Sequence, residues 1–171
     1  TGIDVRGLPA RSPLIGEAGE LGGESFGGAQ QLVNLLETDM AAISLGGDLS
    51  AATDVDWYEF ELTQVDVQLI GGVNDGAGTI AVVFDIDYAD QAVRADTTIA
   101  VYDQDQNLVF VGRESDITDD RQSSPDGSIE DLSRGSLGQK DPYIGPIHLT
   151  PGTETSPRRY FVAVMSDRQL P

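Results

Sequence analysis

The chain has 171 residues, the size of one ordinary domain with a single sizeable core. Its 10 Lys and Arg against 29 Asp and Glu give a net charge of −19, which repels nucleic acid phosphates and anionic membranes over about 8 Å at physiological salt and favours divalent cations. The chain contains no cysteine, which excludes disulfides and thiolate metal sites.

Residues 1–28 are rich in Gly, Pro and Ala and follow neither helical nor strand periodicity. This composition is typical of a linker, or of an arm that becomes ordered by docking onto another surface. We assign residues 1–28 to such an arm and residues 29–171 to one folded domain. The next stretch, AQQLVNLL at residues 29–36, has apolar residues spaced for about two helical turns, and a short extended segment would use the same residues.

From Ile43 onward, short apolar runs with a period of two alternate with clusters of Gly, Asn, Asp and Pro. This pattern is typical of an antiparallel β-sandwich or barrel. The expected strands are residues 43–49, 58–62, 65–71, 79–88, 97–103, 107–112, 143–149 and 158–165. We therefore predict an all-β fold, a jelly-roll-like antiparallel sandwich of about eight strands.

The stretch DVDWYEFEL, residues 54–62, places two acids before one of these strands. Tyr58 begins an alternating apolar series, whereas Trp57 falls on the opposite parity, so we expect the strand to begin near Tyr58 after a turn or bulge. Asp54 and Asp56 would accept backbone hydrogen bonds at this entry, with metal binding as the alternative. Trp57 and Tyr58 are expected in the core rather than in a carbohydrate platform.

The stretch DQDQN offers Asp103, Asp105 and Asn107 at alternate positions, like the start of an EF-hand loop. Calcium takes about six to eight oxygen ligands, which such residues supply. The stretch lacks the glycine and the terminal Glu of that motif, so a solvated hairpin is the alternative.

The longest irregular stretch lies between Arg113 and Pro142 and is strongly acidic. Clustered carboxylates repel one another unless a cation lies between them, and a loop this long is usually functional or held by a ligand. We therefore predict a calcium site there, with a charged, solvated loop as the alternative. The candidate ligands are Asp116, Asp119, Asp120, Asp126, Glu130 and Asp131, joined by Asp87 and Asp96 from the sandwich edge.

Three further motifs do not support catalysis. Asp85 and Asp87 have the spacing of glycosidase carboxylates on one strand face, but no aromatic sugar platform lies nearby in the sequence. Ser136 in SRGSLG has the wrong glycine spacing for a nucleophile elbow. The single histidine, His148, is expected on the outer face of a strand. We expect no enzymatic activity.

The order of segments resembles a known family. AQQL is followed by ISLGGDLSAATDVDWYEFEL, FDIDYADQAVRADTTIAVYDQDQNLV, an acidic loop and GTETSPRRYFVAV, across about residues 29–165. This order is similar to that of the bacterial pre-peptidase C-terminal domain family, with its G-x-L…D-x-D-W/Y-Y-x-F-x-L, L-D-x-x-L-x-L-Y-D-x-x-G and G-x-Y-Y-V-x-V motifs. Here GESFGGAQ replaces the usual acidic preamble E-P-N-D, and ETSPRR is inserted before the closing strand. The resemblance implies a non-catalytic extracellular β-sandwich accessory module, often calcium-stabilised, within a protease or another large surface protein.

The location and role of the chain follow from these features. No apolar stretch approaches the roughly 20 residues that cross a bilayer, and the sequence begins at Thr1 without a leader. We expect a piece of a larger secreted or cell-surface bacterial protein that contributes stability, spacing or adhesion, in contact with neighbouring domains, identical subunits or surface polymers. The alternative is a self-assembling structural subunit of an extracellular filament or surface layer, joined through its N-terminal arm by strand addition.

Overall fold

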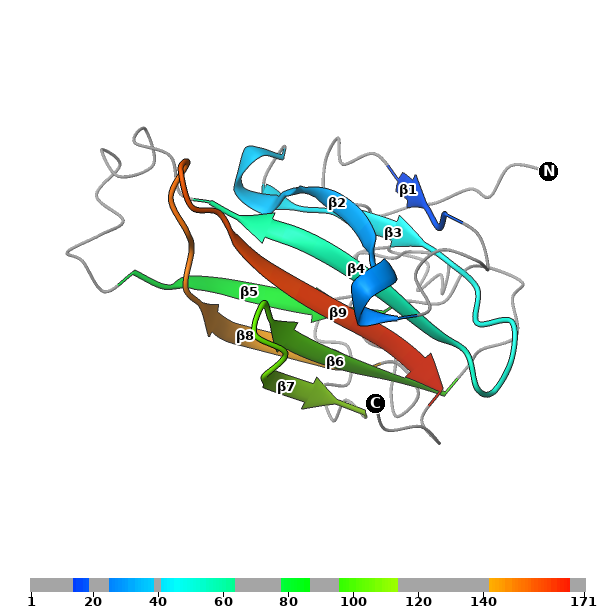
Figure 1. Cartoon of the computed structure of the whole chain (residues 1–171). Coiled ribbons are helices and arrows are strands. Elements are labelled where there is room, and N and C mark those ends of the chain that lie inside the picture. Colours follow the sequence, from blue (N-terminus) through cyan, green and yellow to red (C-terminus); the bar gives the residue numbers. More distant parts are fainter. Residues whose placement is uncertain are drawn as a thin grey trace, which may run out of the picture.

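In the computed structural model, the described residues are 14–18, 25–38, 41–63, 78–86, 96–113 and 142–166. They form nine strands and two short 3-10 helices, so the predicted all-β class is confirmed (Figure 1). The strands are β1 (Leu14–Gly16), β2 (Gln30–Asn34), β3 (Ser44–Gly46), β4 (Val55–Leu62), β5 (Ile80–Asp85), β6 (Thr97–Asp103), β7 (Leu108–Gly112), β8 (Tyr143–Leu149) and β9 (Arg158–Ser166). The helices are η1 (Phe26–Gly28) and η2 (Leu35–Glu37). No helix in the described part of the chain is long and apolar enough to cross a membrane.

The period-two pattern located most of these strands. The expected strands at 97–103, 143–149 and 158–165 correspond to β6, β8 and β9. The strand expected at 107–112 is one residue shorter, as β7, and the one at 43–49 shrinks to the three residues of β3. The described part of 79–88 contains β5. The strand expected at 65–71 lies outside the described residues.

Five strands form the main sheet in the order β2-β4-β9-β6-β7. The central strand, β9, is antiparallel to β4 from Val55↔Met165 to Leu62↔Arg158, and antiparallel to β6 on its other side. β7 returns from β6 through a hairpin and occupies one edge, while β2 occupies the other. The remaining strands form the separate pairs β5–β8 and β1–β3.

The pairings are mixed rather than antiparallel throughout. β1–β3 and β2–β4 run parallel, so the predicted antiparallel arrangement is wrong for these two pairs. Parallel neighbours need a crossover connection of a dozen residues or more, and residues 35–54 provide it between β2 and β4. Strands as short as β1, β2 and β3 carry too few residues for periodicity to reveal their partners.

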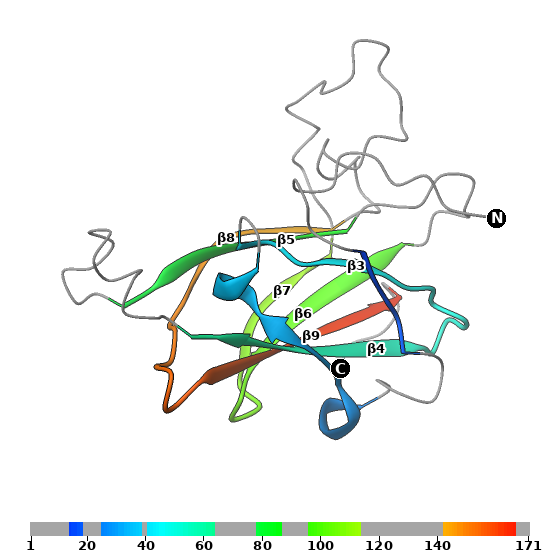
Figure 2. The same ribbon diagram turned by 90° about the horizontal axis from the view of Figure 1, so that it is seen from above.

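The hydrophobic core lies between the main sheet and the β5–β8 pair, which covers one face of that sheet (Figure 2). Near β4, Phe60 and Leu62 pack with Val82. Nearer β6, Ile99 packs with Ile144. Because the buried positions of β4 alternate with less buried ones, a single face of this strand faces the core.

The other face of the main sheet is covered by residues that precede β2. Phe26 in η1 stacks on Phe161 with ring centroids 3.9 Å apart, and its ring meets that of Trp57 edge-on at 5.6 Å. Trp57 and Tyr102, 5.3 Å apart, pack against the fully buried Met165. Part of the predicted arm therefore packs against the domain, and Trp57 joins an aromatic cluster on this second face.

β4 begins at Val55 and pairs with β9 residue by residue to Leu62. The predicted bulge before Tyr58 is therefore wrong. Because both faces of the sheet are covered, Trp57 packs on one face and Tyr58 on the other, and no change of register is needed. Asp56 shares the core-side face with Tyr58 and is only 7% exposed.

Residues 29–36, for which the sequence allowed either a helix or an extended segment, form β2 and then enter η2. Asn34 ends the strand and caps η2, because its Oδ1 accepts a hydrogen bond from the Leu36 backbone N–H at 3.2 Å. The same oxygen accepts from the Thr63 N–H at 3.1 Å, and the Asn34 amide donates to the Thr63 carbonyl at 3.4 Å. One side chain thus joins the end of β2 to the end of β4.

Candidate functional site

The hairpin between β6 and β7 contains three of the predicted calcium ligands. Asp103 Oδ1 accepts hydrogen bonds from the backbone N–H groups of Asp105 and Asn107, both at 2.9 Å. The Asn107 side-chain amide donates to both Asp103 carboxylate oxygens, at 3.2 and 3.0 Å. This side-chain bond, followed by the backbone bonds and the charge of Arg158, holds the pKa of Asp103 below its usual value. The Asp103 carboxylate therefore caps the turn, and calcium binding by Asp103, Asp105 and Asn107 stays a prediction.

Of the predicted ligands outside this hairpin, Asp96 lies within the described residues. Asp96 directly precedes β6 and is exposed. Those that lie outside the described residues are Asp87, Asp116, Asp119, Asp120, Asp126, Glu130 and Asp131. Within the described ranges, no three His, Cys, Asp or Glu side chains gather closely enough to hold a metal ion. Calcium binding by the acidic loop therefore stays a prediction.

Acidic side chains surround the start of β4. Asp54 Oδ2 accepts hydrogen bonds from the Ser50 backbone N–H at 2.7 Å and from the Ser50 hydroxyl at 2.9 Å, which closes the turn before the strand. Glu17 Oε2 accepts from the backbone after β3 at 3.1 Å. Burial, and then the charges of Asp56, Glu17 and Asp54, raise the pKa of the Tyr58 hydroxyl. Asp54 therefore has the structural role predicted for it.

The described residues of the catalytic motifs do not form a reaction centre. A hollow of about 300 Å³ beside the turn at 50–55 is lined by one carboxylate, that of Asp54, which is already bonded to Ser50. His148 is exposed on β8, with its Nδ1 3.4 Å from the Thr79 hydroxyl. Asp85 is exposed at the end of β5. No pair of converging acid and base groups is found among these described side chains.

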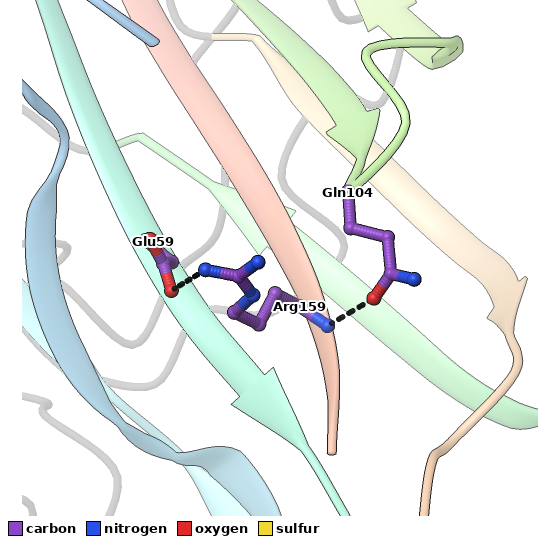
Figure 3. A network of polar contacts seen from close by, with 3 residues as sticks. All are labelled: Glu59, Gln104 and Arg159. Carbon is purple, nitrogen blue, oxygen red and sulfur yellow. Dashed lines mark hydrogen bonds and ion pairs between the residues drawn. The ribbon is translucent and has the colours of Figure 1, made fainter. Parts of the chain in front are cut away.

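Polar contacts join the turn of the β6–β7 hairpin to β9 and β4 within the main sheet (Figure 3). The Arg159 backbone N–H donates to Gln104 Oε1 in the hairpin, at 3.5 Å. The Arg159 guanidinium lies 3.5 Å from Glu59 Oε1 across the β4–β9 pair. An exposed ion pair of this kind contributes little to stability, but the contacts connect the hairpin to the centre of the sheet.

β7, the strand that follows this hairpin, exposes most of its apolar side chains. The exposed fractions are 54% for Leu108, 39% for Val109, 44% for Phe110 and 40% for Val111. Phe110 lies beside Val101 on the core-side face, and Val111 lies beside Ala100 on the other face. Within the described residues, β7 pairs with β6 alone, so its outer edge offers backbone N–H and C=O groups for pairing.

The two ends of β7 carry opposite charges, although the strand itself has none. Asp105 is exposed in the hairpin before the strand, and Arg113 is exposed directly after it. The edge is therefore apolar along its length, with one exposed acid, Asp105, before it and one exposed base, Arg113, directly after it.

The sequence predicted β7 as a strand but not as a candidate site. Its signal is the run LVFV, four apolar residues without the alternation of a half-buried strand. Such a run is usually interpreted as a fully buried strand. Only the strand order places it at an edge, where the same residues are exposed.

Comparison of the chain with protein-family models, curated proteins and solved structures gives no match. The resemblance to the pre-peptidase C-terminal domain family therefore depends on the order of the sequence motifs alone.

Proposed function

We propose that the chain is a non-catalytic β-sandwich module of a larger secreted or cell-surface bacterial protein, and that it acts through contact with other protein surfaces. In this role it contributes stability, spacing or adhesion. The packing of the β5–β8 pair over the main sheet supports the two-layered, sandwich-like form of the module.

The observation that carries the proposal is the β7 edge. Four consecutive apolar side chains are each at least 39% exposed there, beside an edge that pairs with no further strand among the described residues. Exposed apolar patches mark interaction sites, and open edges accept an added strand from another chain. A module with such an edge is suited to binding rather than to chemistry.

Site-directed photocrosslinking tests the role of this edge. A benzophenone amino acid replaces Phe110 in one sample and Val83, an apolar residue 47% exposed on β5, in the control. We expect irradiation of the protein in its natural surroundings to give a discrete crosslinked protein product from position 110 and none from position 83. Equal products, or none from position 110, would contradict a contact role for β7.

Calcium stabilisation is a separate part of the proposal. It is supported by the charge of −19 and by the number of carboxylates between Arg113 and Pro142. Thermal unfolding in excess calcium and in excess chelator tests it, with magnesium as the control for general screening. An unchanged melting temperature would contradict a calcium site.

The second candidate function is a self-assembling subunit joined through its N-terminal arm. Residues from the predicted arm form β1, which pairs with β3, so this arm contains a segment able to add as a strand. Deletion of residues 1–24 leaves Phe26 and its contacts in place. If the arm joins subunits, size-exclusion chromatography and electron microscopy will show loss of assembly. Assembly that survives the deletion rules out arm exchange.

A further inference from the structure

We infer that the outer edge of β7 binds the same edge of a second copy of this chain, antiparallel, and joins two main sheets across a twofold axis. The inference rests on the proposed contact function of β7 and identifies its partner. Twofold dimers pair the same surface of both subunits, so the edge must be complementary to itself.

The charges at the two ends of β7 meet this requirement. In an antiparallel pair, Arg113 of each strand lies near the hairpin that carries Asp105 of the other. A pairing centred on Val109 or Phe110 brings Arg113 of one copy to the hairpin turn of the other, where Asp105 is within reach of a long side chain. A parallel pair would instead place like charges side by side.

The exposed apolar side chains favour the same arrangement. Cross-strand apolar pairs stabilise neighbouring strands, and the most exposed of these side chains, Leu108 and Phe110, would lose contact with water. Two five-residue strands bury less than about 1,000 Å², which is typical of a weak interface. The dimer would therefore form mainly where a parent protein holds copies at high local concentration.

The charge of the whole chain opposes this association at long range. Each copy carries −19, whereas β7 itself is uncharged, so strand pairing along β7 brings no further charge into contact. Salt screens the repulsion over about 8 Å at physiological ionic strength. We expect the dimer to be tighter at physiological salt than at low salt.

Two matched lysine variants test which edge is used. Val109→Lys places a charge in β7, while Val33→Lys makes the same change in β2, at the opposite edge, where Val33 is 50% exposed. Sedimentation velocity over a wide concentration range measures the dimer dissociation constant. We expect Val109→Lys to raise it at least about tenfold, because two lysines then face each other near the twofold axis. Val33→Lys should leave it unchanged. Thermal unfolding checks that both variants fold.

Exchanging the charges of Asp105 and Arg113 tests whether the two β7 strands pair antiparallel. Asp105→Arg alone, or Arg113→Asp alone, should raise the dissociation constant about three- to tenfold, and the double variant should restore it. Asp48→Arg, at an exposed residue in the loop after β3, is the control for the altered net charge.

The outcomes separate this inference from the proposed function. A wild-type chain that is monomeric at every concentration, or a dimer unaffected by Val109→Lys, overturns self-association through β7. A dimer lost in Val33→Lys assigns the interface to β2 instead, and one lost on deletion of residues 1–13 assigns it to the arm. If position 110 crosslinks to a different protein while the chain stays monomeric, the contact function holds and the inference about its partner fails.

Discussion

The two edges of the main sheet, β2 and β7, have the same length but differ in how they end the sheet. β2 has polar residues at three of its five positions, and Val33 is its exposed large apolar side chain. The Gln30 side chain accepts a hydrogen bond from the Ala18 N–H at 2.8 Å and donates to the Gly16 carbonyl at 3.0 Å. β7 has the sequence LVFVG and exposes four apolar side chains in succession.

This difference shows that two open edges with the same backbone chemistry can serve opposite purposes. At β2, amide side chains bond to the neighbouring backbone and tie down the chain segments on either side. At β7, the side chains offer no such bonds, and an added strand is the natural way to cover the edge. The β2 edge should therefore matter for stability, and the β7 edge for association.

Asn34 gives the largest expected effect on stability. Asn34→Ala removes four hydrogen bonds, two of them to the buried backbone of Thr63. Unpaired buried polar groups cost about 1–3 kcal/mol each, so we expect the free energy of unfolding to fall by about 2–4 kcal/mol in urea titrations. A loss below about 1 kcal/mol would show that Asn34 is not what closes this edge.

Phe26, just before β2, should have the next largest effect. Phe26→Ala removes the stack on Phe161 and the contact with Trp57. Because Phe26 is partly exposed, we expect a loss of about 1–2 kcal/mol, less than for a fully buried ring. Phe26→Leu keeps most of the apolar area and should recover part of the loss. If neither variant changes the free energy of unfolding, the covering role of η1 is contradicted.

Tyr58, which pairs with β2 at Gln30, makes this side of the sheet sensitive to alkali. Burial raises the pKa of its hydroxyl above the ordinary 10.0. The neutral form is favoured in the folded state, so its contribution to stability is complete below pH 10 and is lost as pH rises through the folded pKa. Tyr58→Phe should weaken this dependence in unfolding measured from pH 8 to 11. Identical pH slopes for both proteins would contradict the raised pKa.

Asn107, beside β7, should give the smallest effect. Asn107→Ala removes exposed hydrogen bonds to Asp103, and we expect a loss below about 1 kcal/mol. Because the lowered pKa of Asp103 stabilises the fold above about pH 3.8, that contribution is lost as pH falls through the folded pKa. The variant should show a flatter acid dependence. A loss as large as that of Asn34→Ala would remove the proposed contrast between the two edges.

The sequence predicted the long strands well because their apolar residues lie in or near the core. β8 lies over the main sheet, whereas β6 is buried without alternation from Thr97 to Val101 and β9 is apolar from Tyr160 to Met165, because both faces of the main sheet are covered. It did not predict that Phe26 covers the second sheet face, since one aromatic residue in a Gly-rich stretch has no periodicity to interpret. It predicted Trp57 in the core but could not assign this residue to the second sheet face, which Phe26 covers only in the folded structure.

The candidate site was harder to predict than the fold. The pattern of Asp103, Asp105 and Asn107 is common to calcium loops and self-capped turns, and the hydrogen bonds by which Asp103 caps its turn are visible only in the structure. The LVFV run looks like a buried strand until the strand order puts it at an edge. Side-chain chemistry is local, whereas exposure depends on pairings between residues far apart in the sequence.

The central position of β9 has a consequence for biosynthesis. Glu59 in β4 and Arg159 in β9 are neighbours although 100 residues separate them. Until residues 158–166 leave the ribosome, β2–β4 and β6–β7 remain two separate ribbons, and two-stranded ribbons are marginally stable in water. Closure over such a distance is slow, and unpaired strand edges are prone to aggregate in the meantime. A nascent chain halted before residue 158 therefore lacks the strand that joins the two ribbons into one sheet. Its inner strand edges stay unpaired, and it can misassemble, until β9 has been synthesised.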